Sequence, residues 1–320
     1  MRSVGFVDLA LSATGTLVYL GGDATDRPAD LVWVNREGAT EVIDSGAFET
    51  VALSPDGRRV ATTVNTSGEQ QIWIRLLPNG PLSKLTFEGS SNRRPSWSPD
   101  GQAVMFISSR GPRRQIYQQR ADGSAPATLV LEWPAEVLEA LWSRDGRWIV
   151  FRQGVIPQTD ILALRPGVDS APRPLVGTSF AERAPALSPD GQWLAYVSDE
   201  SGVTEVYVRP FPDAERSKFQ VSLNGGTEPL WAHSGRELFY RNTAGELVAA
   251  EITTRPSFVV TRQRALFPAG GFFADDSHRA YDLSPDDRRF LMIRTRGGGE
   301  RSDLVLVEGW FEELKAKVAK

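Results

Sequence analysis

The chain has only two histidines, and these are the first places to look for acid–base or metal chemistry. His278 ends the run Asp275-Asp276-Ser277-His278, in which two carboxylates and an imidazole could ligate a divalent cation. The spacing is loose, and a solvated loop explains Asp275, Asp276 and His278 without requiring any ligand. We therefore predict no metal and no cofactor, and keep these three residues as the alternative. His233 replaces the proline of a degenerate turn, which favours an exposed turn role.

Motifs for nucleophilic or phosphoryl-transfer catalysis are missing from the sequence. No G-x-S-x-G pattern, Gly-rich phosphate loop, VAIK-like strand, HRD element or DFG element occurs. The run Gly297–Gly299 lacks a following helix and is interpreted as a hairpin loop. Aspartates recur once per turn, at Asp56, Asp100, Asp145, Asp190 and Asp286. This regular spacing indicates a turn role for each and not a paired acid and base. We predict that the chain is not an enzyme.

The aspartates belong to a repeated tetrapeptide. Ser-Pro-Asp-Gly occurs at residues 54–57, 98–101 and 188–191, and degenerate copies occur at 12–15, 143–146, 232–235 and 284–287. The seven copies are spaced by 42 to 52 residues. This period is typical of a propeller blade.

The residues around each tetrapeptide predict a β-hairpin. A short apolar strand precedes it and an alternating strand follows it, while Pro, Asp and Gly suit successive positions of a type I turn. A third strand and a weaker fourth complete each unit. The residue before each turn is bulky and apolar and is expected to pack in the seam between blades. These residues are Leu11, Leu53, Trp97, Trp142, Leu187, Trp231 and Leu283.

The resulting prediction is an all-β propeller of four-stranded antiparallel blades, seven in number, with six as the alternative. The propeller is expected to span 1–309. The blades are expected near 7–43, 50–87, 94–131, 139–176, 184–222, 228–267 and 280–308. The last unit shows only three strands, so the N-terminal residues 1–6 are expected to close it. A short helix is predicted at 310–320, where Trp310, Phe311, Leu314 and Val318 follow helical spacing.

Charged residues cluster four and five positions before the turns, where the chain enters the innermost strand of each blade. In a propeller these positions surround the mouth of the central channel, so charges from different repeats converge there. The predicted binding residues at the channel mouth are Asp8, Glu49, Arg93, Arg94, Glu139, Arg183, Glu228 and Arg279. A ring of mixed charge suits a peptide or protein ligand. The alternative is that the starts of these strands are polar because they are exposed.

Composition excludes several classes of partner. The formal net charge is -4 and the basic residues are dispersed, so nucleic acid is not expected as a partner. The chain has no cysteine, which excludes disulfides and thiolate metal sites. No apolar stretch has the length of a membrane span or a signal peptide, so no membrane insertion is expected. We expect a monomer.

The SPDG hairpin followed by an IW, IY or VY strand resembles the TolB-like and WD40-like propeller repeats of bacteria. Four stretches also resemble the C-terminal propeller of membrane-anchored bacterial serine/threonine kinases: LVWVNREG, WLAYVSDESGVTEVYVRPFP, RELFYRNTAGELVA, and YDLSPDDRRFLMI with the closing WFEELK. In such proteins the propeller is extracytoplasmic and the kinase is a separate domain. The resemblance implies a sensor or interaction domain with an extracytoplasmic or periplasmic location.

Two functional hypotheses follow from the sequence. The first is a non-catalytic propeller that binds a ligand or protein, as the sensor domain of a bacterial signalling protein. The second is the accessory propeller of a prolyl oligopeptidase-type hydrolase whose catalytic domain is absent from this sequence.

Overall fold

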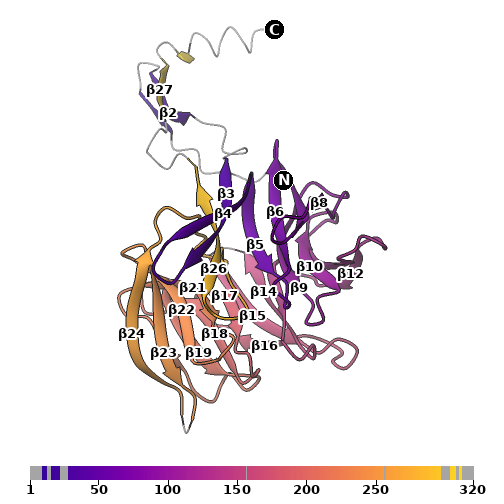
Figure 1. Cartoon of the computed structure of the whole chain (residues 1–320), viewed down its shortest axis with the longest axis vertical. Coiled ribbons are helices and arrows are strands. Elements are labelled where there is room, and N and C mark those ends of the chain that lie inside the picture. The colour runs from indigo at the N-terminus through magenta and orange to yellow at the C-terminus, as the bar shows by residue number, and fades with distance from the viewer. Residues whose placement is uncertain are drawn as a thin grey trace.

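The computed structural model describes residues 9–12, 16–21, 28–155, 157–255, 257–296, 303–307 and 310–311. Within them, six four-stranded antiparallel sheets form the blades of one propeller (Figure 1). A separate three-stranded sheet, β1-β2-β27, is drawn above the blades in Figure 1.

The strand bounds are as follows. Blade 1 contains β25 (Asp282–Leu283), β26 (Arg289–Thr295), β3 (Ala29–Asn35) and β4 (Thr40–Gly46). Blade 2 contains β5 (Phe48–Leu53), β6 (Arg59–Thr66), β7 (Glu69–Leu76) and β8 (Leu82–Lys84). Blade 3 contains β9 (Asn92–Trp97), β10 (Ala103–Ser108), β11 (Gln115–Arg120) and β12 (Thr128–Leu131). Blade 4 contains β13 (Val137–Trp142), β14 (Ile149–Val155), β15 (Gln158–Leu164) and β16 (Arg173–Val176). Blade 5 contains β17 (Arg183–Leu187), β18 (Trp193–Ser198), β19 (Glu205–Pro210) and β20 (Phe219–Gln220). Blade 6 contains β21 (Gly226–Trp231), β22 (Glu237–Asn242), β23 (Glu246–Thr253) and β24 (Val259–Pro268). The additional sheet contains β1 (Leu9–Leu11), β2 (Leu17–Gly21) and β27 (Asp303–Val307).

The prediction of seven blades is wrong, because two of the repeat units share one blade. The units at 7–43 and 280–308 each contribute one hairpin to blade 1, where β26 pairs with β3 from Arg289↔Asn35 to Thr295↔Ala29. The leftover strands of these two units, β1, β2 and β27, pair with one another outside the blades. Seven turn copies therefore produce six blades.

The predicted turn chemistry is confirmed between the first and second strands of the blades. In blade 2 the amide of Gly57 donates to the carbonyl of Ser54 at 2.8 Å, which closes the turn. The Ser54 hydroxyl donates to Asp56 at 2.6 Å and accepts from the amide of Arg59 at 2.9 Å. Gly57 has a φ of 69°, which glycine adopts without the steric cost of a side chain. The serine and aspartate thus stabilise the hairpin by bonds to residues close in the sequence.

The hydrophobic core lies in the seams between blades. One buried cluster joins Ala52 and Ile72 of blade 2 to Trp97 and Phe106 of blade 3. The indole N–H of Trp97 also donates to the carbonyl of Ala52 at 2.9 Å. Because each seam is filled by side chains from both blades, no blade buries its apolar face alone.

Of the predicted helix at 310–320, only Trp310 and Phe311 fall within the described residues, and both are helical there. The rest of the segment lies outside the residues that the structure describes. In the same described part of the chain, no helix is long and apolar enough to cross a membrane.

Candidate functional site

The innermost strand of several blades carries a β-bulge close to its start. The pairing register shifts in β5, β9, β13, β17 and β21. The residue four positions before the turn lies in this irregular stretch, and it has a positive φ at Arg94 (56°), Ala184 (48°) and Glu228 (56°). Left-handed backbone costs free energy for residues other than glycine, and a bulge re-aims the side chain that it carries. We call these positions the bulge positions.

Side chains at the bulge positions bridge neighbouring blades. Glu139 of blade 4 accepts a bond from the amide of Ala184, the bulge position of blade 5, at 3.0 Å. Glu228 of blade 6 accepts one from the amide of Ala280, the corresponding position of blade 1, at 2.9 Å. Arg94 of blade 3 donates to the carbonyl of Leu138 in blade 4 at 2.9 Å. The same place in the repeat thus links three pairs of blades.

A segment between β24 and β25, residues 273–281, lies across the channel at this level, and we call it the plug. Asp275 forms an ion pair with Arg94 at 3.1 Å, and His278 contacts Glu139 at 2.8 Å between Nδ1 and Oε2. The amide of Asp275 donates to Glu228 at 3.1 Å. The plug is therefore fastened to blades 3, 4 and 6. The face of the propeller on which the first strand of each blade begins is called the plug face, and the opposite face is called the turn face.

Burial and ion pairing determine the protonation states of the side chains that contact the plug. The Glu139 and Arg152 side chains are 5% and 1% exposed and form an ion pair at 2.7 Å. Burial alone would raise the pKa of Glu139, but Arg152 and His278 outweigh it and hold that pKa below its ordinary value. For His278, burial is the largest influence and lowers the pKa. Glu139 is therefore a fixed anion between a buried guanidinium and a largely neutral imidazole.

Glu228 is also buried beside an arginine, but its pKa is raised whereas that of Glu139 is lowered. Its side chain is fully buried, and Arg241 lies 3.1 Å away in an ion pair. Burial raises the pKa of Glu228 to about 7, because desolvation exceeds the attraction of Arg241 and of the two backbone amides. Glu228 therefore gains and loses its proton near neutral pH.

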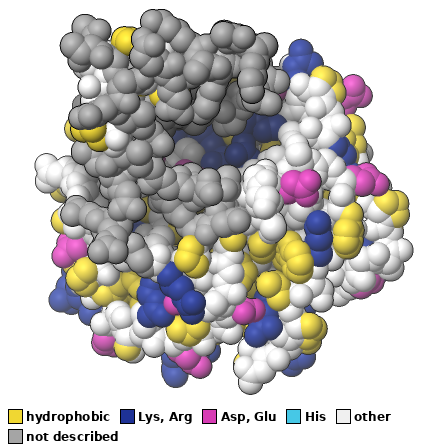
Figure 2. Space-filling model, turned by 90° about the horizontal axis from the view of Figure 1, so that it is seen from above, with side chains coloured by type: hydrophobic (Ala, Val, Ile, Leu, Met, Phe, Trp, Pro, Cys, Tyr) yellow, Lys and Arg dark blue, Asp and Glu magenta, His cyan; other side chains and the backbone are white. Residues whose placement is uncertain are grey.

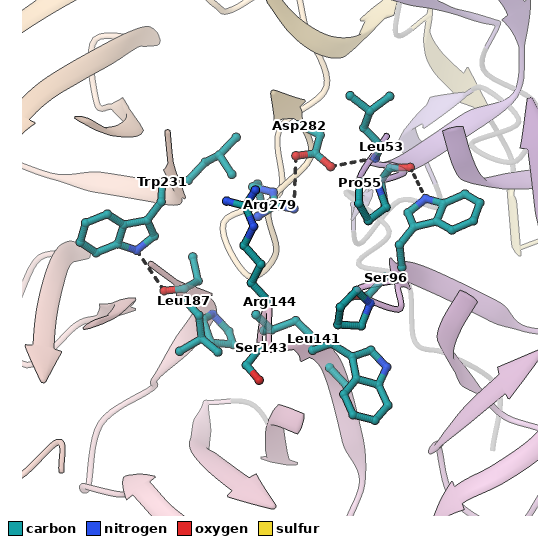
Figure 3. A pocket seen from close by; sticks show the side chains of 18 of the residues that line it. Leu53, Pro55, Ser96, Leu141, Ser143, Arg144, Leu187, Trp231, Arg279 and Asp282 are labelled. Atoms are coloured by element: carbon teal, nitrogen blue, oxygen red, sulfur yellow. Dashed lines mark hydrogen bonds and ion pairs between the residues drawn. The ribbon is translucent and has the colours of Figure 1, made fainter. Parts of the chain in front are cut away.

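On the turn side of the plug, the channel contains a cavity of about 430 Å³. Its wall is formed by the first strands of the blades and by the turns, and Figure 3 shows Leu53, Leu141, Leu187 and Trp231 around a common space. Arg144, His233, Arg279 and Asp282 supply charged and titratable groups, and Glu139 and His278, which contact each other, also line the cavity. An apolar wall with a few polar groups is the usual composition of a ligand pocket.

The predicted mouth residues have different surroundings in the structure. Glu139, Glu228 and Arg94 converge on the plug, as described above. Arg183 forms an ion pair with Asp199 at 3.3 Å, and Arg279 lies 3.7 Å from Asp282 and lines the cavity. Glu49 accepts bonds from Asn65 and Gln70, both at 2.6 Å. The Arg93 side chain has no hydrogen bond or ion pair within the described residues, and Asp8 lies outside the residues that the structure describes.

Two of the three residues of the metal alternative contact other protein groups. Asp275 is engaged by Arg94 and Ser277, and His278 by Glu139. No cluster of three or more His, Cys, Asp or Glu side chains that could hold an ion occurs within the part of the chain that the structure describes.

Several important residues were absent from the predicted site. Arg152 and Arg241 form the ion pairs beneath the plug, yet they lie within second strands where the sequence shows only a charge in an apolar run. That interruption was the available signal, since an arginine in a buried strand needs a partner. Arg144 was also missed, although it takes the proline position of its turn and lines the cavity.

Comparison with known families and proteins supports the fold. Residues 36–169 match the family described as TolB beta propeller domain. The uncharacterized peptidase YuxL of Bacillus subtilis is 28% identical over 162 residues, which is 48% of this chain and 23% of that protein. The uncharacterized protein Atu1656 of Agrobacterium fabrum is 28% identical over 62% of this chain and 73% of its own length. This chain's matches to YuxL and to a TolB homologue of Chlorobium luteolum span only 23% and 25% of those proteins.

Solved structures agree on the architecture. A protein of Agrobacterium tumefaciens assigned to TolB superposes with a TM-score of 0.66, with 18% identity over 86% of this chain and 99% of that one. A prolyl endopeptidase structure gives a TM-score of 0.51, with 16% identity over 92% of this chain and 50% of that one. At these identities the likeness concerns the fold alone. The described part of the chain is a six-bladed β-propeller, and its residues 36–169 are similar to the TolB propeller domain.

Proposed function

We propose that this propeller is a non-catalytic binding domain that takes up a polypeptide segment in its axial channel through the turn face. The observation that carries the proposal is the cavity of about 430 Å³, which the plug closes at one end. A channel closed at one end suits the end of a chain or a projecting side chain more than a polypeptide that passes through.

The wall of the cavity supports a polypeptide ligand. Leucine, tryptophan and proline side chains from several blades supply apolar area, and aromatic anchors of this kind contribute strongly to peptide binding. Asp282 is already engaged by the amide of Leu53 at 2.8 Å, whereas Arg144 is exposed at the turn. The free charge facing a ligand is therefore positive, and an apolar segment with an acidic group would match it.

The two histidines support a non-catalytic role. His233 Nδ1 contacts Asp287 at 2.9 Å, but Asp287 also accepts bonds from the amides of His233 and Ser234. Asp287 thus ties the turn of blade 6 to that of blade 1. No serine hydroxyl bonds to either imidazole in the described residues, so the arrangement of a hydrolytic triad is not formed there.

The test is a selection of peptides from a random displayed library, followed by calorimetric measurement of Kd. Arg144→Glu reverses a charge that lines the cavity, and Arg58→Glu makes the same change on an exposed turn outside it. We expect selected peptides to bind Arg144→Glu about tenfold or more weakly than the parent and to bind Arg58→Glu unchanged. Equal loss in both variants, or no enrichment of any peptide, would overturn the proposal.

The finer role that we propose is the sensor or interaction domain of a bacterial signalling protein. It is supported by the four sequence stretches that resemble the propellers of membrane-anchored kinases. A binding domain with a blind channel would suit such a role, since it can be occupied without processing its ligand.

An accessory role beside a hydrolase is the second candidate. The match to YuxL and the likeness to a prolyl endopeptidase over 50% of that chain favour it. Labelling of the natural protein with a fluorophosphonate probe distinguishes the two. A labelled serine on the same polypeptide would favour the accessory role, and an unlabelled polypeptide would favour the binding domain alone.

A further inference from the structure

The plug face carries a second feature that the channel does not use. Seen from this side, the propeller is hollowed, and Lys and Arg side chains gather inside the hollow (Figure 2). Arg93 lies near the start of β9, and so on the plug face, next to the bulge at Arg94, and the pKa of Arg93 responds to the charges of Arg94 and Arg114. Three arginines of blade 3 thus form one cluster, which we call the arginine cluster.

Within this cluster, two of the three guanidinium groups have partners. Arg94 is engaged by Asp275, and Arg114 forms an ion pair with Glu136 at 2.7 Å. Arg93 has none, and its Nε is buried without a hydrogen-bond acceptor in the part of the chain described. A buried donor left unpaired costs free energy, and more so when it belongs to a charged group.

Arg93 is largely buried and lies close to other positively charged side chains. Burial, followed by the repulsion of Arg94 and Arg114, lowers the pKa of Arg93 to about 10, although Asp275 and Glu49 act in the other direction. The side chain is therefore still charged at neutral pH. A cation held in this way gains from any anion that reaches it, because attraction is strong where water is partly excluded.

The charges around the cluster also limit what kind of anion can bind. Asp275, Glu136 and Glu49 lie around the same arginines and repel a multiply charged ligand. One free guanidinium offers a planar pair of donors that matches a single carboxylate. A dianionic phosphate would need more than one free cation.

We propose that Arg93 is the anchor of a carboxylate-binding site on the plug face. The ligand class is a polypeptide carboxylate, from an acidic side chain or a C-terminus. The site is separate from the channel, since the plug lies between them. It does not depend on the binding proposed at the turn face.

Thermal unfolding in a series of sodium acetate concentrations tests the site, with sodium chloride and sodium phosphate at matched ionic strength and pH as references. A ligand that binds the folded state raises Tm in a saturable way. Arg93→Gln removes the anchor, Arg93→Lys keeps its charge without the planar donors, and Arg113→Gln is the matched control, since Arg113 is exposed and adjacent to the cluster.

We expect a saturable rise with acetate in the parent chain and in Arg113→Gln. Arg93→Gln and Arg93→Lys should weaken the apparent affinity by about tenfold or more. If Arg93→Gln fails to fold, Arg93→Lys alone decides. No saturable response in the parent chain, an unchanged response in the Arg93 variants, or a stronger response to phosphate than to acetate would overturn the proposal.

Discussion

The two ends of the channel are stabilised by different kinds of contact: bonds within each turn on the turn face, and bonds between blades and the plug on the plug face. On the turn face blades 1 to 5 repeat one local arrangement, in which a serine hydroxyl, an aspartate and a left-handed fourth residue close the hairpin, as at Ser98, Asp100 and Gly101. The degenerate turn of blade 6, residues 232–235, lacks this serine and aspartate. On the plug face the equivalent positions hold different residues, and their partners come from other blades. Arg94 and Asp275, for example, are 181 positions apart in the chain.

This difference separates architecture from specificity. The repeated turns close their hairpins mainly by bonds within each turn, and contacts between turns, such as that of Asp287 with His233, are additional. The bulge positions vary because each must match a particular part of the plug or of the next blade. Ligand-specific features of this propeller are therefore expected where the repeat is least regular.

The largest effect should come from breaking the buried network. Glu139→Ala leaves Arg152 charged and unpaired in the interior, which should cost about 3 to 5 kcal/mol of unfolding free energy. Glu136→Ala is the control, because its ion pair with Arg114 is partly exposed and should contribute less than about 1 kcal/mol. Urea denaturation measures both. Equal losses would mean that the plug network is no more important than a surface pair.

The seams should show the next largest effect. Trp231 is 4% exposed and its indole donates to the carbonyl of Ala186 at 3.1 Å, so Trp231→Ala should cost about 3 to 4 kcal/mol. Trp142 occupies the same position in the repeat but is only partly buried, and its indole nitrogen has no acceptor in the described residues. Trp142→Ala should therefore cost less, about 2 kcal/mol. A larger loss at Trp142 in chemical denaturation would reverse this ranking.

A pH dependence should distinguish Glu228 from the rest of the molecule. Its folded pKa of about 7 lies above the ordinary value of 4.5, so the folded state holds the proton more tightly than the unfolded state. The associated stability is fully present below about pH 4.5 and is lost as pH rises through 7, by on the order of 3 kcal/mol.

Comparison with Glu228→Gln isolates this contribution, because the variant cannot titrate. The unfolding free energy of the parent should fall relative to that of Glu228→Gln between pH 5 and pH 8. A constant difference, or one that grows in favour of the parent, would show that Glu228 is ionised throughout the range.

The smallest effects should be found at the turns. Ser98→Ala removes the hydroxyl that donates to Asp100 at 2.6 Å and accepts from the amide of Ala103 at 2.9 Å, at a cost of about 1 kcal/mol. Ser54→Ala should match it within about 0.5 kcal/mol, since the bonds are equivalent. Clearly unequal costs in denaturant unfolding would mean that turns depend on their blade.

Local features of the fold could be predicted from the sequence, whereas the closure could not. The SPDG turns, the strands beside them and the blade architecture follow from short-range chemistry. The number of blades was overestimated because each turn copy was counted as one blade. The pairing of Ile293 with Leu31 joins segments that are distant in the sequence, and no spacing rule reveals it.

The candidate site was predictable to a similar degree. The repeat spacing brought Arg94, Glu139 and Glu228 to one level of the channel, as the structure shows. Their partners could not be deduced, because the run from Asp275 to His278 is uninformative until its position across the channel is known. The charged positions four residues before the turns indicated that charges converge, but not that they bind residues of the plug.

The closure of blade 1 also has a consequence for the order of folding. Blades 2 to 6 are built from consecutive strands, so each can pair its strands as soon as its own stretch of chain exists. The hairpin β3-β4 must wait for β26, and until then the edge of β3 is open along Leu31, Val32 and Val34, which are fully buried in the finished ring. Open apolar edges favour pairing with other chains. The edge of β3 is therefore exposed to aggregation until β26, near the end of the chain, pairs with it.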